Sequence, residues 1–309
     1  MAQPPGALMS EPSRSPARGT SALLFVSTTA LLLSATAAAN CARDEDCSLN
    51  GACSAGGACA CFAPWTGDAC ALLAFGLGPA VNGYGVSPRV NAWGGSAVFF
   101  ENKWHAYISE MAENCSLADW YRNSQVVHGV SSSPLGPFAR ADVALGVFAH
   151  EPQVSLSRAP DGSALFALWH VGNANGDATP NNCTAAGGGA PASAAAGGGA
   201  PAAAATAAAA GSALHVAPTP AGPWTPITLE LPPCNNPSQA RRSDGMWFLL
   251  CNNAADQRET NGTIFTAPDI VGPWSFFSNA AGPLPEANVP EDGFLFFDAR
   301  GHWHILFHT

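Results

Sequence analysis

A three-part repeat that runs from residue 72 onward constrains the fold more than any other feature of the chain. Three segments end in a short β-prone run, a proline-containing turn and Gly-Pro-aromatic: 126–140, 213–226 and 263–276. A turn and then an aromatic-rich strand occurs upstream four times, as ENKWHAYISE, PDGSALFALWHV, SDGMWFLLCNN and ARGHWHILFHT. Each copy follows a polar strand start, which reads VNAW, HEP, NNP or EDG.

The repeating unit predicts an all-β fold. Units of roughly 45–60 residues made only of strands and turns have the size of a propeller blade, and each must stack on its neighbours to bury its faces. A β-sandwich is the competing all-β architecture, but it does not require one motif to recur in register. We therefore expect a β-propeller over residues 72–309.

The count of units affects how this propeller is closed. Four unit starts are visible, and the fourth unit has two strands before Thr309. Because propellers of about four to eight blades close into a ring, we expect an incomplete, C-terminally truncated propeller. The alternatives are a complementary partner and a four-bladed ring closed by residues 72–90.

The second unit is interrupted by a low-complexity stretch at residues 184–213, which contains mainly alanine, glycine and proline. It has no charge and no large apolar side chain, so it has nothing to contribute to a core. We expect a flexible loop inserted between two strands of one blade.

The N-terminus predicts entry into a secretory pathway. Arg14 and Arg18 precede a short apolar run and small residues near Ala37–Ala39, so residues 1–39 have the layout of a signal peptide. An uncleaved signal anchor is the alternative. We expect a secreted, extracellular protein, or else a type II membrane protein facing the endomembrane lumen. Contact with a membrane is expected only in the second case.

Six cysteines lie close together in residues 40–71, at positions 41, 47, 53, 59, 61 and 70. Six cysteines allow fifteen pairings, and ten cysteines in the whole chain indicate an oxidising compartment rather than a zinc site. The spacing and the ending with Trp65, Gly67 and Cys70 resemble an EGF-like domain. That resemblance implies the disulfides Cys41–Cys53, Cys47–Cys59 and Cys61–Cys70. The acidic residues of the calcium-binding form are absent before Cys41, so we expect no calcium.

Composition and motifs exclude several functions. The chain carries 12 Lys+Arg against 22 Asp+Glu, so it has no basic surface for nucleic acid. No phosphate-binding glycine loop, serine-nucleophile motif or metal-ligand spacing occurs. We expect no cofactor and no metal.

Candidate site residues come from the polar strand starts, because in a propeller these starts face a common pocket. The first start offers Asn91 and Trp93, the second His150 and Glu151, the third Asn235 and Asn236, and the fourth Glu291 and Asp292. Amides and carboxylates hydrogen-bond hydroxyl groups and an indole offers a flat apolar face, so we expect a sugar site. Hydrolysis of a glycosidic bond requires two carboxyl groups, and Glu151 with Asp292 or Glu291 would supply them.

The DG-x-x-aromatic hairpins, the Gly-Pro-Trp endings and the polar-Pro strand starts over residues 88–309 resemble the five-bladed propeller glycosidases of glycoside hydrolase family 43 and relatives. The resemblance implies five blades, a glycan or polysaccharide substrate and hydrolysis of O-glycosidic bonds by carboxylates. The sequence departs from the family where Asn91 stands in place of an expected Asp, and again at Asn235 and Asn236. Glu151 and Asp292, then Glu291, are the expected catalytic residues. The alternative is an inactive propeller that binds carbohydrate or protein, with acids that only cap strand starts.

Two more disulfides and three glycosylation sequons are predicted outside the EGF-like region. Cys234 and Cys251 flank one hairpin, so antiparallel pairing would bring them together, and Cys115 and Cys183 follow the second strands of adjacent units. The sequons begin at Asn114, Asn182 and Asn261.

Overall fold

A computed structural model describes residues 41–74, 83–84, 90–172, 180, 183, 211–231, 234–252, 262–279, 291–298 and 300–308. The chain divides into two compact units, Met1–Ala74 and Phe75–Thr309. The predicted signal segment and residues 184–210 of the predicted insert lie outside the described residues. Ser212 and Ala213, predicted to belong to the insert, instead begin strand β11 (Ser212–Ala217).

The first unit is a small disulfide-bonded module. Its elements are the 3-10 helix η1 (Asp44–Cys47) and the strands β1 (Gly51–Cys53), β2 (Cys59–Cys61), β3 (Trp65–Thr66) and β4 (Leu72–Leu73). The three disulfides implied by the EGF resemblance are confirmed, namely Cys41–Cys53, Cys47–Cys59 and Cys61–Cys70. The hydrophobic cluster of this unit consists of half-cystines with Trp65 packed against them. Cross-links therefore take the place of an apolar core.

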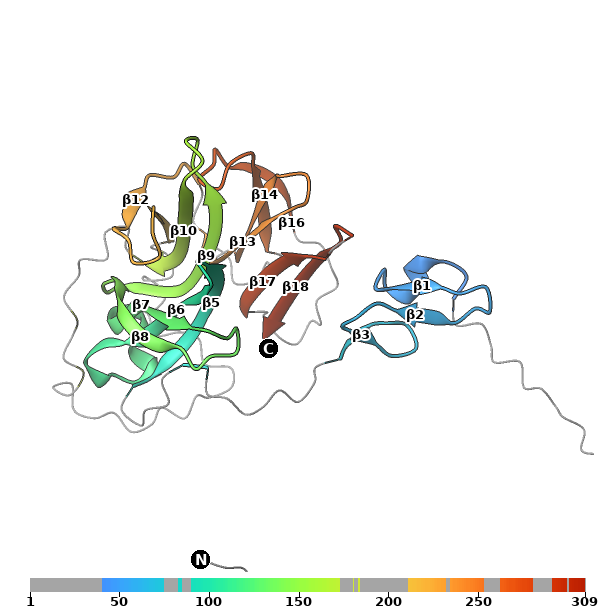
Figure 1. Ribbon diagram of the computed structural model, residues 1–309, viewed down its shortest axis with the longest axis horizontal. Helices are drawn as coiled ribbons and strands as arrows, with labels where there is room; N and C mark the ends of the chain where they lie inside the picture. Colours follow the sequence, from blue (N-terminus) through green and yellow to red (C-terminus); the bar gives the residue numbers. More distant parts are fainter. Residues whose placement is uncertain are drawn as a thin grey trace, which may run out of the picture. The chain divides into compact units, whose positions relative to one another are not determined.

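The second unit contains antiparallel sheets built from consecutive strands (Figure 1). The first sheet has β5 (Ala92–Phe100), β6 (Lys103–Met111), β7 (Ser124–Ser131) and β8 (Ala139–Leu145). The second has β9 (Ala149–Arg158), β10 (Ala164–Gly172), β11 and β12 (Thr225–Ile227). The third has β13 (Asn235–Arg241), β14 (Trp247–Asn252), β15 (Thr263–Ala267) and β16 (Ser275–Asn279). The fourth described sheet pairs β17 (Glu291–Phe297) with β18 (Trp303–His308).

Short helical segments follow β6. They are η2 (Ala112–Asn114), η3 (Leu117–Asp119) and the one-turn helix α1 (Trp120–Asn123). No helix in the described part of the chain is both long and apolar enough to span a membrane.

The Gly-Pro-aromatic motif lies inside each of the three four-stranded sheets, between the third and fourth strands. The sequence interpretation placed it at the end of the unit, and the structure adds β8, β12 and β16 after it. Its glycine is required by the backbone, because Gly222 and Gly272 have φ of 95° and 106°. A Cβ at Gly222 would also lie 3.0 Å from the backbone nitrogen of Trp224. The motif is therefore a turn that leads into the outermost strand.

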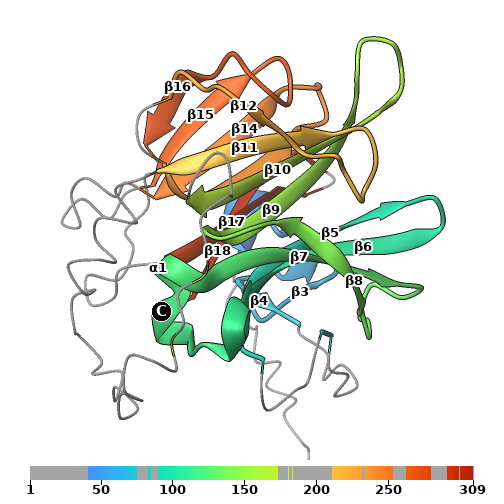
Figure 2. The same ribbon diagram turned by 90° about the vertical axis from the view of Figure 1, so that its left-hand side faces the viewer.

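Alternate side chains of each sheet pack on the two neighbouring sheets. On β10, Leu168 faces the first sheet and joins a cluster with Tyr107, while Trp169 faces the third sheet and packs with Leu249. On β14, Phe248 packs in turn against Leu295 of β17. This alternation follows from the period of two along a strand. Figure 2 shows the four-stranded sheets stacked one on the next.

The inner strands β5, β9, β13 and β17 lie side by side in chain order. The predicted all-β, propeller-like fold is thereby confirmed, whereas five blades and closure of the ring stay predictions. Both disulfides predicted in this unit are present, Cys234–Cys251 and Cys115–Cys183. Asn114 of the first sequon is exposed, and the other two sequon asparagines lie outside the described residues.

Candidate active site

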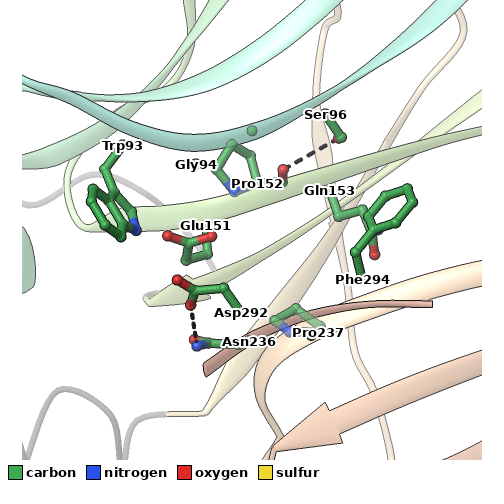
Figure 3. A pocket seen from close by; sticks show the side chains of 12 residues that line it. Trp93, Gly94, Ser96, Glu151, Pro152, Gln153, Asn236, Pro237, Asp292 and Phe294 are labelled. Carbon is green, nitrogen blue, oxygen red and sulfur yellow. Dashed lines mark hydrogen bonds between the residues drawn. The ribbon is translucent and has the colours of Figure 1, made fainter. Parts of the chain in front are cut away.

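The starts of the four inner strands enclose a pocket of about 450 Å³ (Figure 3). Trp93 and the residues up to Ser96 line it from β5, and Glu151 to Gln153 line it from β9. The side chains of Asn236 and Asp292 come from β13 and β17. The structure thus brings together four of the eight predicted site residues from four different sheets.

Each of the four inner strands has a β-bulge near its start, and the bulge sets the direction of the residue that lies in it. The pairing register shifts at each start, and the residue at the shift has a left-handed backbone: Gly94, Glu151, Asn236 and Asp292 have φ of 61°, 50°, 44° and 52°. Asn and Asp tolerate this conformation better than Glu does, and it costs Glu151 about 1–2 kcal/mol. Bulges that turn a side chain are common next to functional sites, and here each one directs its residue toward the pocket.

The structure places Gly94, and not Asn91, at the position equivalent to Glu151. Asn91 lies before β5 and its Nδ2 donates to the carbonyl oxygen of Cys115 at 2.8 Å. A Cβ built on Gly94 would lie 2.5 Å from Oε2 of Glu151. The carboxylate of Glu151 therefore occupies the space that a side chain from the first sheet would otherwise fill.

Glu151 is held from behind by buried polar groups. Its side chain is 13% exposed, and its backbone N–H donates to Oγ of Ser109 at 2.9 Å. His150 does not line the pocket; its Nε2 lies 3.6 Å from Oε1 of Glu151 and its Nδ1 lies 2.8 Å from Oγ of Ser124. Burial lowers the pKa of His150 to about 3, so the ring is neutral at physiological pH. The neutral His150 ring and the Ser124 hydroxyl therefore lie behind the carboxylate of Glu151.

Asp292 is oriented by an amide from the neighbouring sheet. Nδ2 of Asn236 donates to Oδ1 of Asp292 at 2.6 Å, as Figure 3 shows. The predicted partners of these two residues are placed differently. Asn235 pairs with Asn252 and is not part of the pocket lining, and Glu291 pairs with His308 while its side chain lies outside the described atoms.

Polar side chains below the pocket form hydrogen bonds between the inner strands. Sequence reasoning did not identify these residues. Ser238 of β13 accepts two hydrogen bonds at Oγ, from Nε2 of Gln153 at 3.0 Å and from the backbone N–H of Leu295 at 2.8 Å. Oγ of Ser96 accepts from the N–H of Val154 at 2.6 Å. The one sequence signal for them was a polar residue directly after the Gly or Pro of three strand starts.

The charge of the pocket is negative. Its described lining contains two carboxylates and no Lys or Arg. The groups of potential metal ligands in the described residues are built on cysteines, Cys41 with Cys47 and Cys59, and Cys115 with Cys183 and Asp119. All these cysteines form disulfides, so they do not offer thiolates to a metal.

No protein-family model matches the chain, and no curated protein matches it. Solved structures do match. An endo-1,4-β-xylanase from Bacteroides thetaiotaomicron is 16% identical, with 71% of this chain and 65% of that chain covered and a TM-score of 0.37. A family 117 glycoside hydrolase from Zobellia galactanivorans is 13% identical over 71% of this chain and 67% of that chain, with a TM-score of 0.43.

The GH43_1 enzyme from Xanthomonas citri, complexed with xylose, is 14% identical over 71% of this chain and 63% of that chain, with a TM-score of 0.41. The matches thus span about two thirds of the length of these solved chains. Family 43 is also the family that the repeat motifs of this sequence resemble.

Proposed function

We propose that this protein is a glycoside hydrolase that binds a glycan in the pocket at the strand starts and cleaves an O-glycosidic bond there. The observation that carries the proposal is the convergence of Glu151 and Asp292, from the second and fourth sheets, on one pocket. Glycoside hydrolysis uses two carboxyl groups that flank the scissile bond, one as acid and one as base or nucleophile. Both carboxyl groups are held in place, by the groups behind Glu151 and by Asn236.

The lining of the pocket supports a neutral sugar as substrate. Trp93 is 39% exposed at the rim and offers an apolar ring face to a sugar. Asn236 and Gln153 add amide groups, which hydrogen-bond hydroxyl groups. Two carboxylates without a lining cation would repel uronates and sulfated sugars.

An inactive carbohydrate- or protein-binding module is the second candidate. Gly94 supports it, because the first sheet presents no side chain where the other three present Glu, Asn and Asp. The third sheet also presents an amide, so two of the four equivalent positions are acids. Such a pocket would bind a glycan through Trp93 and the amides without cleaving it.

Replacing each carboxylate by its amide distinguishes the hydrolase from the inactive binding module. We expect Glu151→Gln and Asp292→Asn each to lower glycan cleavage by about a hundredfold or more, because each removes one of the two required carboxyl groups. Glycan binding by the same variants should persist, while Trp93→Ala should weaken it. The measurement is product release from a panel of neutral polysaccharides together with calorimetric binding. Full activity in both variants, or no cleavage by the parent protein, would overturn the hydrolase proposal.

We also propose that the sheets belong to a five-bladed ring. Phe99 on β5 and Leu306 on β18 are exposed by 51% and 40%. These exposed apolar groups support a further sheet between the first and the fourth. Crystallography of the full-length protein tests this, and direct packing of β17 on β5 would contradict it.

We propose that the protein is secreted, because its cysteines are oxidised to disulfides. All ten are predicted to be oxidised, and five disulfides account for them in the described residues. This is typical of oxidising compartments. The N-terminal sequence of the protein from culture medium distinguishes a cleaved signal from a retained anchor.

A further inference from the structure

A second pocket, of about 490 Å³, lies at the opposite ends of the inner strands. Phe100 lines it at the end of β5, Leu156 to Arg158 at the end of β9, and Arg241 at the end of β13. The candidate active site is formed by the starts of these same strands, so the two pockets share no residue.

Two arginines occupy equivalent positions in this pocket. Arg158 and Arg241 are the last residues of β9 and β13, and each binds the hairpin glycine four residues later. Nη1 of Arg158 donates to the carbonyl oxygen of Gly162 at 2.8 Å, and Nε of Arg241 donates to that of Gly245 at 3.3 Å. A guanidinium has five N–H donors, so these bonds fix each side chain while leaving most of its donors for a ligand.

These two guanidinium groups form no ion pair with a carboxylate of the described residues. By contrast, Arg140, Arg242 and Arg300 are paired with Glu110, Asp244 and Asp298. Asp269 also lines the pocket, but its Oδ1 accepts from the N–H of Val271 in its own turn at 3.2 Å. The described lining therefore carries two positive charges against one negative charge, in a chain whose formal net charge is −10.

We propose that this pocket is a second binding site, for a carboxylate or sulfate group carried on one or two sugar rings. Guanidinium groups bind planar or branched oxyanions through paired hydrogen bonds. The volume falls within the range of sites for small ligands, and Leu156 and Pro268 supply apolar contact for a ring. Its charge is opposite to that of the acidic pocket, so the two sites would select different sugars.

Calorimetric titration of the full chain with glucuronic acid, galactose 6-sulfate and glucose tests the proposal. We expect the two anionic sugars to bind, glucose not to bind at this site, and binding to weaken as salt is added. Ser163→Ala, at an exposed residue that lines neither pocket, should bind the anionic sugars with unchanged affinity, and no step of the titration requires glycan cleavage. The test is therefore independent of the proposed hydrolase activity.

Substitution of the two arginines tests directly whether they bind the anionic sugars. Arg158→Gln and Arg241→Gln should each lower the affinity about ten- to a hundredfold, since each removes charged hydrogen bonds. Arg242→Gln is the matched control on the same hairpin, because Arg242 does not line the pocket and is paired with Asp244. Unfolding curves of all variants check that these exposed substitutions leave the fold intact.

Three outcomes would overturn the proposal. The first is unchanged binding of both anionic sugars by the Arg158→Gln, Arg241→Gln double variant. The second is inorganic sulfate binding as tightly as galactose 6-sulfate, which would leave no role for the ring. The third is binding of a glutamate-rich peptide without binding of either anionic sugar.

Discussion

Among single residues, Gly94 decides what the pocket contains. It has the left-handed backbone of the bulge, and it leaves room for the carboxylate of Glu151. Comparison of the repeats drew attention to Asn91 because that residue is polar and precedes Trp93. The residue equivalent to Glu151 is the bulge residue Gly94, three positions after Asn91, and the place of a bulge depends on cross-strand pairing that local sequence does not specify.

Gly94→Ala should therefore impair the pocket more than the fold. The new Cβ would lie 2.5 Å from Oε2 of Glu151 and displace the carboxylate. We expect glycan cleavage to fall on the order of ten- to a hundredfold, as for other misplaced catalytic groups. Gly162→Ala is the matched control, since Gly162 has φ of 83° and a Cβ added there would meet no atom within 4 Å. Both variants should lose about 1 kcal/mol of stability, and equal activity would contradict the steric argument.

Buried histidines predict that acid destabilises the protein. Burial lowers the pKa of His150 and of His170 to about 3, below the ordinary value near 6.5. Between these two pH values the unfolded chain binds protons that the folded chain does not. The free energy of unfolding should thus fall as pH drops from about 6.5 to about 3, by up to about 1.4 kcal/mol per pH unit for each histidine.

Urea unfolding at pH 7, 6, 5 and 4 measures this dependence. His170→Gln removes one of the two groups, so its unfolding free energy should vary less with pH than that of the parent. His170 is fully buried beside His215 and does not line the pocket, whereas His150 contacts Glu151, so His170 is the cleaner of the two positions. Equal pH dependence in parent and variant would show that His170 does not contribute.

Among the strands, hydrogen bonds between the inner members hold the four sheets in register beneath the pocket. Ser238 is 2% exposed and accepts from Gln153 of β9 and from Leu295 of β17, so one hydroxyl links three sheets. Sequence reasoning predicted the stacking of the repeats, because a unit of that size cannot bury its faces alone. It did not predict these links, because a serine after a proline has many other uses.

Ser238→Ala should lower the free energy of unfolding by about 1–3 kcal/mol, because it leaves the buried N–H of Leu295 and the amide of Gln153 without their acceptor. Ser163→Ala, in an exposed hairpin turn of the second sheet, is the control and should change stability by about 0.5 kcal/mol or less. Denaturant unfolding of the two variants measures the difference. Similar stabilities would mean that water replaces the lost hydroxyl.

In the protein taken as a whole, the two units are stabilised by different means. The unit up to Ala74 has a hydrophobic cluster of half-cystines and Trp65, whereas the unit from Phe75 onward buries large apolar side chains between its sheets. The cysteine spacing identified the first arrangement, and the strand repeat identified the second.

Reduction should therefore unfold the first unit and spare the second. Without its three disulfides, the unit up to Ala74 has too little apolar surface to offset its chain entropy. We expect dithiothreitol to expose residues 41–74 to proteolysis while residues 91–172 stay protected. Mass spectrometry of the fragments, with the oxidised protein as control, measures this. Protection of both units after reduction would contradict the argument.

Local sequence was enough to specify the class of the fold, the five disulfide pairs and the four strand starts from which the pocket is built. The repeats and the cysteine positions carry this information, with the resemblance to an EGF-like domain supplying three of the pairings. Tertiary contacts selected the residue of each start that enters the pocket. They placed Glu151, Asn236 and Asp292 there, left Gly94 without a side chain, and put His150 behind Glu151. A bulge shifts the register by one residue and turns side chains to the other face, and its position is set by pairing with strands that are distant in sequence.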